Sequence, residues 1–573
     1  MTFPFRTATR RTRRTRRTRP GRRWTAAVLA AVTSVTLVAG LAACAGPSDP
    51  SDRDGASREL IYLESLPFNS LYPPAAGFYP NGGIVNNITD RLLWQDPDTL
   101  ELHPWIATDL PEVNDDATEF TFTLRDDVTY SDGTPLTAEN VVRNFDLYAL
   151  GDTDRGLSSS EQISAYDRGE ALDERTVRFH FTDPEPGFPQ ATSSFNAGLL
   201  ADASLERSDD GFAPGNATAV IGSGPFVITD EQLNTEVTLD ARDDYDWAPQ
   251  GAEHQGAPQI DRVSVAITQE DSVRVGGLKS AQGDVARQIE APEEQHLADE
   301  GIGILSAPTN GVNNQLAFRF RHPLLSDIRV RQAIIAGVDR DRILNSLFSD
   351  SYVNATSALA STADGYREQK DAYVFDPDRA RDLLDEAGWV PGDDGIRVKD
   401  GERLSLTAND SEQQPRTREV ITMVQEQLRA IGVEVNLYPG DVAAQKAAQV
   451  NQDLIQLNVT MVGRADYDVI KSQYYSQNRN QLLNYDTEDE SVGDPELEEL
   501  LLKVSGSVEE DDRAAASGDV QNYLTDQAYV LPFFEEPQVY GVQDYVHGFR
   551  TDPIGRPWFY PVSIADGADG GDE

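Results

Sequence analysis

One short charged element stands out as a candidate for binding chemistry. Residues 454–462 have the apolar character of a strand, and Gly463-Arg464-Ala465-Asp466-Tyr467 follows directly. In α/β proteins the end of a strand commonly presents polar groups to a cleft. We therefore take Arg464, Asp466 and Tyr467 as candidate ligand contacts. The alternative is that Asp466 is a solvated turn residue, which is the usual role of a lone aspartate after a strand.

A second group of polar and aromatic residues lies near the start of the chain. Tyr79, Asn86 and Asn87 combine an aromatic face with amide groups, a mixture that suits a polar organic ligand. Packing or turn formation would explain each of them equally well. Proline and glycine predict an irregular chain before residue 84, and residues 84–94 are predicted to form a short helix.

Several familiar chemistries lack their sequence signatures. The six histidines show no HExxH spacing, and no GxSxG sequence occurs. The Asp-Gly turns at 393–395 and 399–401 lack the ligand spacing of a calcium loop, and GSGP at 222–225 lacks the lysine of a phosphate loop. We predict no catalytic residue, no metal site and no cofactor. Paired carboxylates are too abundant among 96 acidic residues to indicate a glycosidase.

The elements that would position these residues follow from local patterns. Residues 120–125 alternate apolar and polar side chains, which predicts a strand, and 128–130 predict a second strand that completes a hairpin. Thr137 can cap a following helix, and Asp376 can cap another that begins at Pro377. Strands at 404–407 and 433–438 flank a helix at 416–431, an order that favours a parallel pair with a right-handed crossover.

The run TFTLRDDVTYSDGTPLTAENVV closely resembles the signature of the peptide- and nickel-type extracellular solute-binding proteins, family 5, of ABC importers. IGSGPFVI, LLSDIRVRQAIIAGVDRDRIL and FDPDRARDLLDEAGW agree in the same order, so the resemblance spans roughly residues 58–563. It implies an α/β, two-lobed periplasmic-binding-protein-like fold of type II, with an extra domain and a ligand cleft between the lobes. It also implies a lipoprotein that closes its lobes around a solute and delivers it to a permease and an ATPase.

The resemblance also implies a division of the chain. Lobe I is expected to comprise 58–92, 219–302 and a C-terminal return at 530–564, with lobe II at 303–529 and the extra domain at 93–218. The chain would then cross between the lobes near residues 302 and 530. Two crossings of this kind would form a hinge.

The same resemblance suggests a role for Asp466. Peptide-binding relatives carry an Ala-Asp-Tyr-like element here, whose aspartate pairs with the terminal amine of the ligand. Many relatives have a tryptophan just before it, whereas Met461 to Arg464 stand there in this chain. Arg464 could therefore meet a ligand carboxylate instead. Oligopeptides are the leading ligand class. Nickel chelates, opines, glycosides and siderophores remain alternatives, as does a sensor or adhesin that transports nothing.

The N-terminal sequence is typical of an export signal. The first 23 residues are arginine-rich without an acidic residue, and an apolar run then ends in Leu-Ala-Ala-Cys44. This pattern predicts a signal peptide at 1–43, a lipid on Cys44, a flexible tether at 44–57 and attachment to the outer face of the cytoplasmic membrane. A retained membrane helix is the alternative, and the choice between Sec and Tat export stays open. A frayed tail is predicted at 565–573.

Composition limits the partners and the means of stabilisation. The single cysteine excludes an internal disulfide. A formal net charge of −47 disfavours nucleic acid and anionic lipid as partners. We expect a monomer that touches the membrane only through its lipid.

Overall fold

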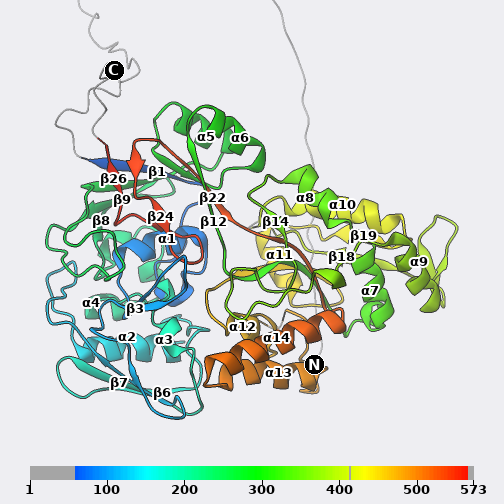
Figure 1. Cartoon of the computed structure of the whole chain (residues 1–573), viewed down its shortest axis with the longest axis horizontal. Coiled ribbons are helices and arrows are strands. Elements are labelled where there is room, and N and C mark those ends of the chain that lie inside the picture. Colours follow the sequence, from blue (N-terminus) through cyan, green and yellow to red (C-terminus); the bar gives the residue numbers. More distant parts are fainter. Residues whose placement is uncertain (1–57, 412–413, 480, 566–573) are drawn as a thin grey trace, which may run out of the picture. The chain divides into compact units, whose positions relative to one another are not determined.

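The structure is a computed structural model that describes residues 58–411, 414–479 and 481–565 (Figure 1). The predicted signal peptide, Cys44, the tether through residue 57 and residues 566–573 of the predicted tail lie outside these ranges and remain predictions. Across the described ranges, no helix combines the length and apolar character needed to cross a membrane.

A seven-stranded sheet has the order β12-β22-β11-β1-β10-β9-β8. Its strands are β1 (Glu59–Glu64), β8 (Phe226–Gln232), β9 (Glu236–Ala241), β10 (Arg262–Ile267), β11 (Val285–Arg287), β12 (Gly303–Ala307) and β22 (Gln538–Val542). The central strand β1 runs parallel to β10 and β11, and its Leu60, Tyr62 and Leu63 side chains are buried. Helices α5 (Asp271–Lys279) and α6 (Ala291–Asp299) connect strands of this sheet.

A six-stranded sheet has the order β14-β21-β13-β20-β18-β19. Its strands are β13 (Gly311–Phe318), β14 (Val353–Asn354), β18 (Ser405–Ala408), β19 (Glu434–Leu437), β20 (Leu457–Gly463) and β21 (Val530–Glu535). Between β18 and β19 lies α10 (Thr417–Arg429), and the two strands pair in parallel, which confirms the predicted strand-helix-strand unit. The other helices of this part are α7 (Ile328–Ala336), α8 (Arg340–Leu347), α9 (Pro377–Glu386), α11 (Val442–Gln449), α12 (Val469–Tyr474), α13 (Pro495–Gly506) and α14 (Glu510–Asp526).

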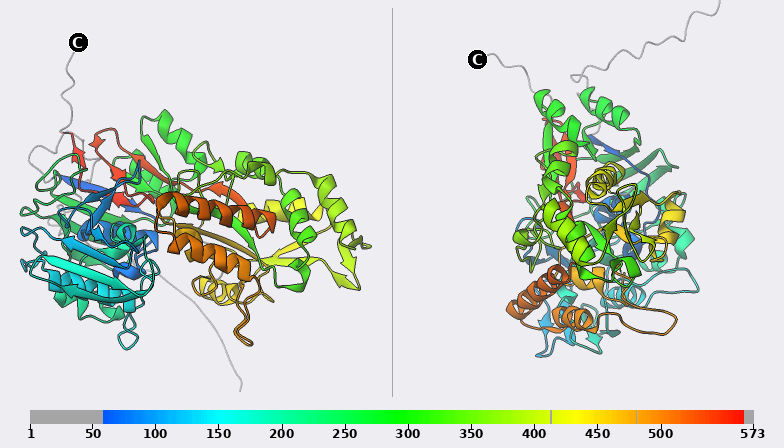
Figure 2. Two further views of the ribbon diagram at one scale, coloured as in Figure 1. Left: turned by 60° about the horizontal axis from the view of Figure 1, so that its bottom comes forward. Right: turned by 90° about the vertical axis from the view of Figure 1, so that its right-hand side faces the viewer.

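Two connecting segments join these sheets. Residues 308–310 lead from β12 to β13, and residues 536–537 lead from β21 to β22. The predicted crossings near 302 and 530 were therefore several residues too early. The reason is that β12 still pairs with β22 in the seven-stranded sheet, and β21 still pairs with β13 in the six-stranded sheet, before the chain crosses. Figure 2 shows the ribbon from two further directions.

A four-stranded sheet, β4-β5-β7-β6, lies within the predicted extra domain. It contains β4 (Glu112–Val113), β5 (Glu119–Thr123), β6 (Tyr166–Ala171) and β7 (Thr176–Phe181), accompanied by α2 (Ala138–Leu150), α3 (Phe188–Ala191) and α4 (Asp202–Leu205). Its buried apolar residues and those of the seven-stranded sheet form one continuous core. The Thr137 hydroxyl accepts a hydrogen bond from the Asn140 amide, which confirms the predicted cap.

The predicted hairpin of 120–125 with 128–130 is wrong. β5 pairs with β4 and with the distant β7, whereas residues 128–130 make only an isolated bridge from Thr129 to Pro135. Aromatic packing explains the choice, because Phe122 of β5 meets Phe179 of β7 edge to face at 6.0 Å between ring centroids.

The helix predicted at 84–94 begins and ends earlier. α1 spans Tyr79–Ile88, and residues 93–95 form the strand β2 (Leu93–Gln95), which pairs with β3 (Leu102–Pro104). Pro80 is tolerated because it occupies the first turn, where its missing N–H leaves no bond unmade. Small strands complete the chain: β15 (Val390–Pro391), β16 (Arg397–Lys399), β17 (Glu402–Arg403), β23 (Val546–His547), β24 (Arg550–Thr551), β25 (Pro557–Trp558) and β26 (Ser563–Ile564).

Candidate ligand-binding cleft

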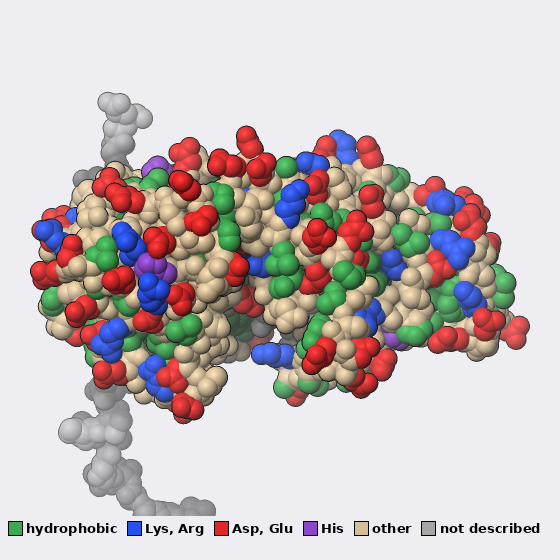
Figure 3. Space-filling model, turned by 90° about the horizontal axis from the view of Figure 1, so that it is seen from below, with side chains coloured by type: hydrophobic (Ala, Val, Ile, Leu, Met, Phe, Trp, Pro, Cys, Tyr) green, Lys and Arg blue, Asp and Glu red, His purple; other side chains and the backbone are tan. Residues whose placement is uncertain are grey.

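A cavity of about 570 Å³, here called the large cleft, is lined from both major sheets and from the segment at 158–162. Residues 287–290 and 536–539 line it near the connecting segments, and 461–464 bring the end of β20 to it. This volume is in the usual range for sites that bury a small organic ligand. Figure 3 shows one face of the molecule, on which acidic side chains are spread widely rather than gathered in one patch.

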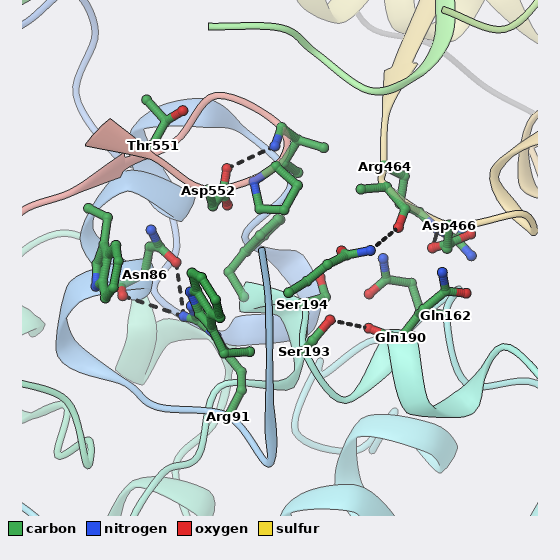
Figure 4. Close-up of a pocket in the computed structure, with 17 residues that line it drawn as sticks. Asn86, Arg91, Gln162, Gln190, Ser193, Ser194, Arg464, Asp466, Thr551 and Asp552 are labelled. Atoms are coloured by element: carbon green, nitrogen blue, oxygen red, sulfur yellow. Dashed lines mark hydrogen bonds and ion pairs between the residues drawn. The ribbon is translucent and has the colours of Figure 1, made fainter. Parts of the chain in front are cut away.

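A second cavity of about 40 Å³, here called the small cavity, lies beside the large cleft. The two share Gln162, Phe195 and Arg464 as lining residues. Figure 4 shows Asn86, Arg91, Thr551 and Asp552 on one side of it and Gln162, Gln190, Arg464 and Asp466 on the other. The small cavity is therefore a side chamber of the cleft, lined by both polar and apolar side chains.

Arg464 and Asp466 form a buried ion pair at the edge of the small cavity. The Arg464 Nε donates to the Asp466 Oδ2 at 2.5 Å, and both side chains are at least 90% buried. Burial alone would lower the pKa of Arg464, but the neighbouring carboxylates, Asp466 first among them, raise it above its usual value. The two residues lie only two positions apart in the bend that follows β20. Asp466 is thus already neutralised by a residue of its own chain.

The predicted contact residue Tyr79 lines the large cleft. Its hydroxyl donates to the Ile554 carbonyl at 2.9 Å, and burial raises its pKa to about 12. The Arg556 guanidinium lies over its ring, 4.7 Å from the centroid, and also over the ring of Phe195 at 3.8 Å. The ring of Tyr79 therefore helps to hold a buried cation in the cleft wall.

The structure separates the two predicted asparagines. Asn86 lines the small cavity, donates to the Pro557 carbonyl and accepts from the Arg91 Nη1 at 2.9 Å. Asn87 lines neither cavity. It is completely buried, and its amide bonds to the backbone of Gly83, Pro557 and Phe559, so that it ties α1 to β25. These bonds give Asn87 a structural role, and a ligand contact by this residue stays a prediction.

Tyr467 also lies in the protein interior, and its role as a ligand contact stays a prediction. It packs in a hydrophobic core beside the six-stranded sheet, with Arg513 over its ring at 4.8 Å, and it lines neither cavity.

Hydrogen bonds cross from the four-stranded-sheet region and β2 to the six-stranded-sheet region. Glu161 accepts from the Ser472 hydroxyl at 3.0 Å and from the Arg479 Nε at 2.9 Å. Gln190 donates to Asp364 at 3.1 Å, and the Gln95 amide donates to the Ala465 carbonyl at 3.0 Å. These contacts hold both walls of the cleft together away from the two connecting segments.

No sequence pattern indicated two buried charged residues that line the large cleft. Arg287 is held by Glu64 through Nη2 at 2.7 Å. Glu536 lies on the connecting segment 536–537, where burial raises its pKa to about 7 although Asn314 donates to it at 3.2 Å. Among the described residues no cluster of three or more histidine, cysteine or acidic side chains could hold a metal ion.

Comparison with known proteins yields one family match and several relatives. The model of the bacterial extracellular solute-binding proteins, family 5 Middle, matches residues 101–481. Protein XP55 of Streptomyces lividans is 27% identical over 84% of this chain and 84% of its own length. The dipeptide-binding protein of Escherichia coli K12 is 25% identical over 81% of this chain and 87% of its own.

Among solved structures, NikA from Brucella suis in complex with Fe(III)-EDTA superposes with a TM-score of 0.76 at 21% identity. The superposition covers 88% of this chain and 100% of NikA. The predicted fold class is confirmed: the chain has the two-lobed α/β fold of periplasmic binding proteins. The seven- and six-stranded sheets are the centres of what we call the first and second lobes.

Proposed function

Because this chain belongs to the bacterial extracellular solute-binding proteins of family 5, we propose that it is the ligand-capturing subunit of an ABC importer for oligopeptides or peptide-like solutes. The observation that carries this proposal is the large cleft of about 570 Å³, lined from both lobes. Within the described ranges, only the connections at 308–310 and 536–537 join the strands of the two major sheets. Such an arrangement supports closure of the lobes around a ligand.

Closure would be driven by contacts that exist only when both lobes touch the ligand. A ligand that bridges Tyr79 and residues 461–464 interacts more favourably with the closed form than with the open form, and so shifts the population toward closure. The permease would then recognise the closed form, and transport energy would come from the ATPase. These two partners and the monomeric state belong to the proposal.

The proposed contact residues are those that the structure brings to the cavities: Arg464, Asp466, Tyr79 and Asn86. In the proposal a lipid on Cys44 holds the protein at the outer face of the cytoplasmic membrane, after removal of residues 1–43. Residues 44–57 would act as the tether.

Native mass spectrometry of the full chain, purified gently from its own host, tests the function. Closed lobes bury a ligand and slow its escape, so we expect a peptide-sized mass that is released on denaturation. Retention of no peptide, together with no thermal shift in peptide mixtures, would contradict the peptide class. Metal chelates, opines, oligosaccharides and siderophores would then be the next ligands to screen.

A further inference from the structure

Four buried polar atoms on residues that line the small cavity have no hydrogen-bond partner within the described ranges. They are the Asp466 Oδ1, the Gln162 Oε1, the Arg464 Nη1 and the Arg91 Nε. Two are acceptors and two are donors, and they come from both walls of the cleft. Buried groups of this kind are normally satisfied, so four of them around one cavity indicate a missing partner.

The charges around the small cavity cancel. Its charged lining residues are Arg91 and Arg464 against Asp466 and Asp552. Asp466 is bound by Arg464, Asp552 accepts the backbone amides of Ile554 and Arg556, and Arg91 donates to Asn86. An incoming ammonium would therefore find no uncompensated carboxylate, and it would meet the buried Arg464 cation beside Asp466.

We propose that, within the importer role proposed above, the small cavity binds a neutral end group of the ligand, either a carboxamide or a hydroxyl, and rejects a free ammonium. Both neutral groups can donate and accept hydrogen bonds. Such a group donates to the Asp466 Oδ1 or the Gln162 Oε1 and accepts from the Arg464 Nη1. The volume of about 40 Å³ admits a few heavy atoms, so the rest of the ligand lies in the large cleft. Arg464 is the residue that sets this preference.

A paired peptide library tests the proposal on the full chain. The library holds lysine-free tri- to pentapeptides, each present with a free N-terminus and with an acetylated one, and native mass spectrometry reports which forms are captured. We expect the acetylated forms to be enriched by at least about tenfold, because they present a neutral amide where the free forms present a charge. Equal capture, or enrichment of the free forms, overturns the proposal and leaves the importer function standing.

Two variants separate the charge effect from misfolding. Arg464→Met leaves Asp466 without its cation, so the preference should reverse toward free amines. Asp466→Asn is nearly isosteric and leaves the arginine, so it should keep the preference for acetylated forms. Arg342→Met removes an exposed arginine that pairs with Glu426, away from both cavities, and should change nothing. If Arg464→Met and Asp466→Asn shift the preference in the same direction, the proposal fails.

A parallel library of neutral oligosaccharides distinguishes an amide from a hydroxyl as the end group. Capture of oligosaccharides alone, lost in Arg464→Met, supports the neutral end group and contradicts the peptide class. Capture of nothing from either library by the wild type overturns both the end-group proposal and the proposed ligand class.

Discussion

Glu536 is a carboxyl group buried at the point where the chain leaves β21 for the other lobe. Burial raises its pKa from 4.5 to about 7. Between these two pH values the folded protein holds a proton that the unfolded chain has released, so stability falls as the pH rises through this interval. Glu536→Gln removes the titrating carboxyl group, and with it this fall in stability at higher pH. The variant should match the wild type near pH 4.5 and exceed its free energy of unfolding by about 3 kcal/mol at pH 8.

Urea unfolding at a series of pH values measures this difference. Glu499→Gln, at an exposed position on α13, is the matched control and should give a difference near zero throughout. A Glu536→Gln effect that is the same at pH 4.5 and pH 8 would show that packing, not protonation, separates the variant from the wild type.

At the residue scale, the sequence predicts well those roles that depend on near neighbours. The caps at Thr137 and Asp376 were predictable because each side chain bonds an amide three residues ahead. The ion pair of Arg464 with Asp466 could have been found from the same kind of argument, since only one residue separates the two opposite charges along the chain. The structural role of Asn87 could not have been predicted in this way, because its partners Pro557 and Phe559 are more than 460 residues away.

At the element scale, α1 contains Gly82, a residue type with low helix propensity, because the packing leaves no room for a Cβ at this position. A Cβ on Gly82 would lie 2.0 Å from the Arg556 Nε and 3.0 Å from the Ala76 carbonyl oxygen. Arg556 cannot easily withdraw, because it is buried against the rings of Tyr79 and Phe195. Gly82→Ala should therefore lower the free energy of unfolding by about 1–3 kcal/mol despite the better propensity of alanine.

Gly276 on α5 provides the matched control for Gly82. It is exposed, and a Cβ there would have no neighbour within 4 Å. Gly276→Ala should raise the free energy of unfolding by roughly 0.5–1 kcal/mol, because only the conformational freedom of the unfolded chain changes. Guanidinium denaturation of both variants checks the pair, and stabilisation by Gly82→Ala would contradict the close packing of α1 against Arg556.

Element prediction failed where a contact from elsewhere in the chain decides the local structure. The glycines at 82 and 83 indicated an irregular chain, yet they permit close approach of Arg556 and Pro557 to a regular helix. On the side where the nearby residues 128–130 were expected, β5 pairs with β7, more than 50 residues ahead. By contrast, β18, α10 and β19 form a local unit, and its pattern predicted it correctly.

At the scale of the whole molecule, the family resemblance predicted two lobes. The local sequence patterns alone could not have predicted them. Each major sheet collects strands from distant parts of the chain: β22 returns to β11 and β12, and β21 returns to β13. Alternation of apolar residues shows that a strand exists but not which sheet it joins. This is why the two crossings were placed before β12 and β21 instead of after them.

The contacts of Glu161 with Ser472 and Arg479 should govern how long the lobes stay closed. Both charged side chains of the ion pair are about two-fifths exposed, so the pair is worth less than about 1 kcal/mol. Glu161→Gln should therefore raise the dissociation rate of the captured ligand by up to about fivefold, with little change in the association rate. Stopped-flow displacement of the ligand measures both rates.

Salt separates this electrostatic effect from a change in packing. At 1 M salt the Debye length falls to about 3 Å, so wild type and Glu161→Gln should converge toward one dissociation rate. Glu206→Gln removes an exposed carboxylate that faces Arg143 within the same four-stranded-sheet region. Within the described part of the chain Glu206 makes no ion pair across the cleft, so this variant should behave as the wild type at every salt concentration. If Glu161→Gln keeps its faster release at high salt, the hydrogen bond from Ser472, which salt screens little, is the contact that holds the walls together.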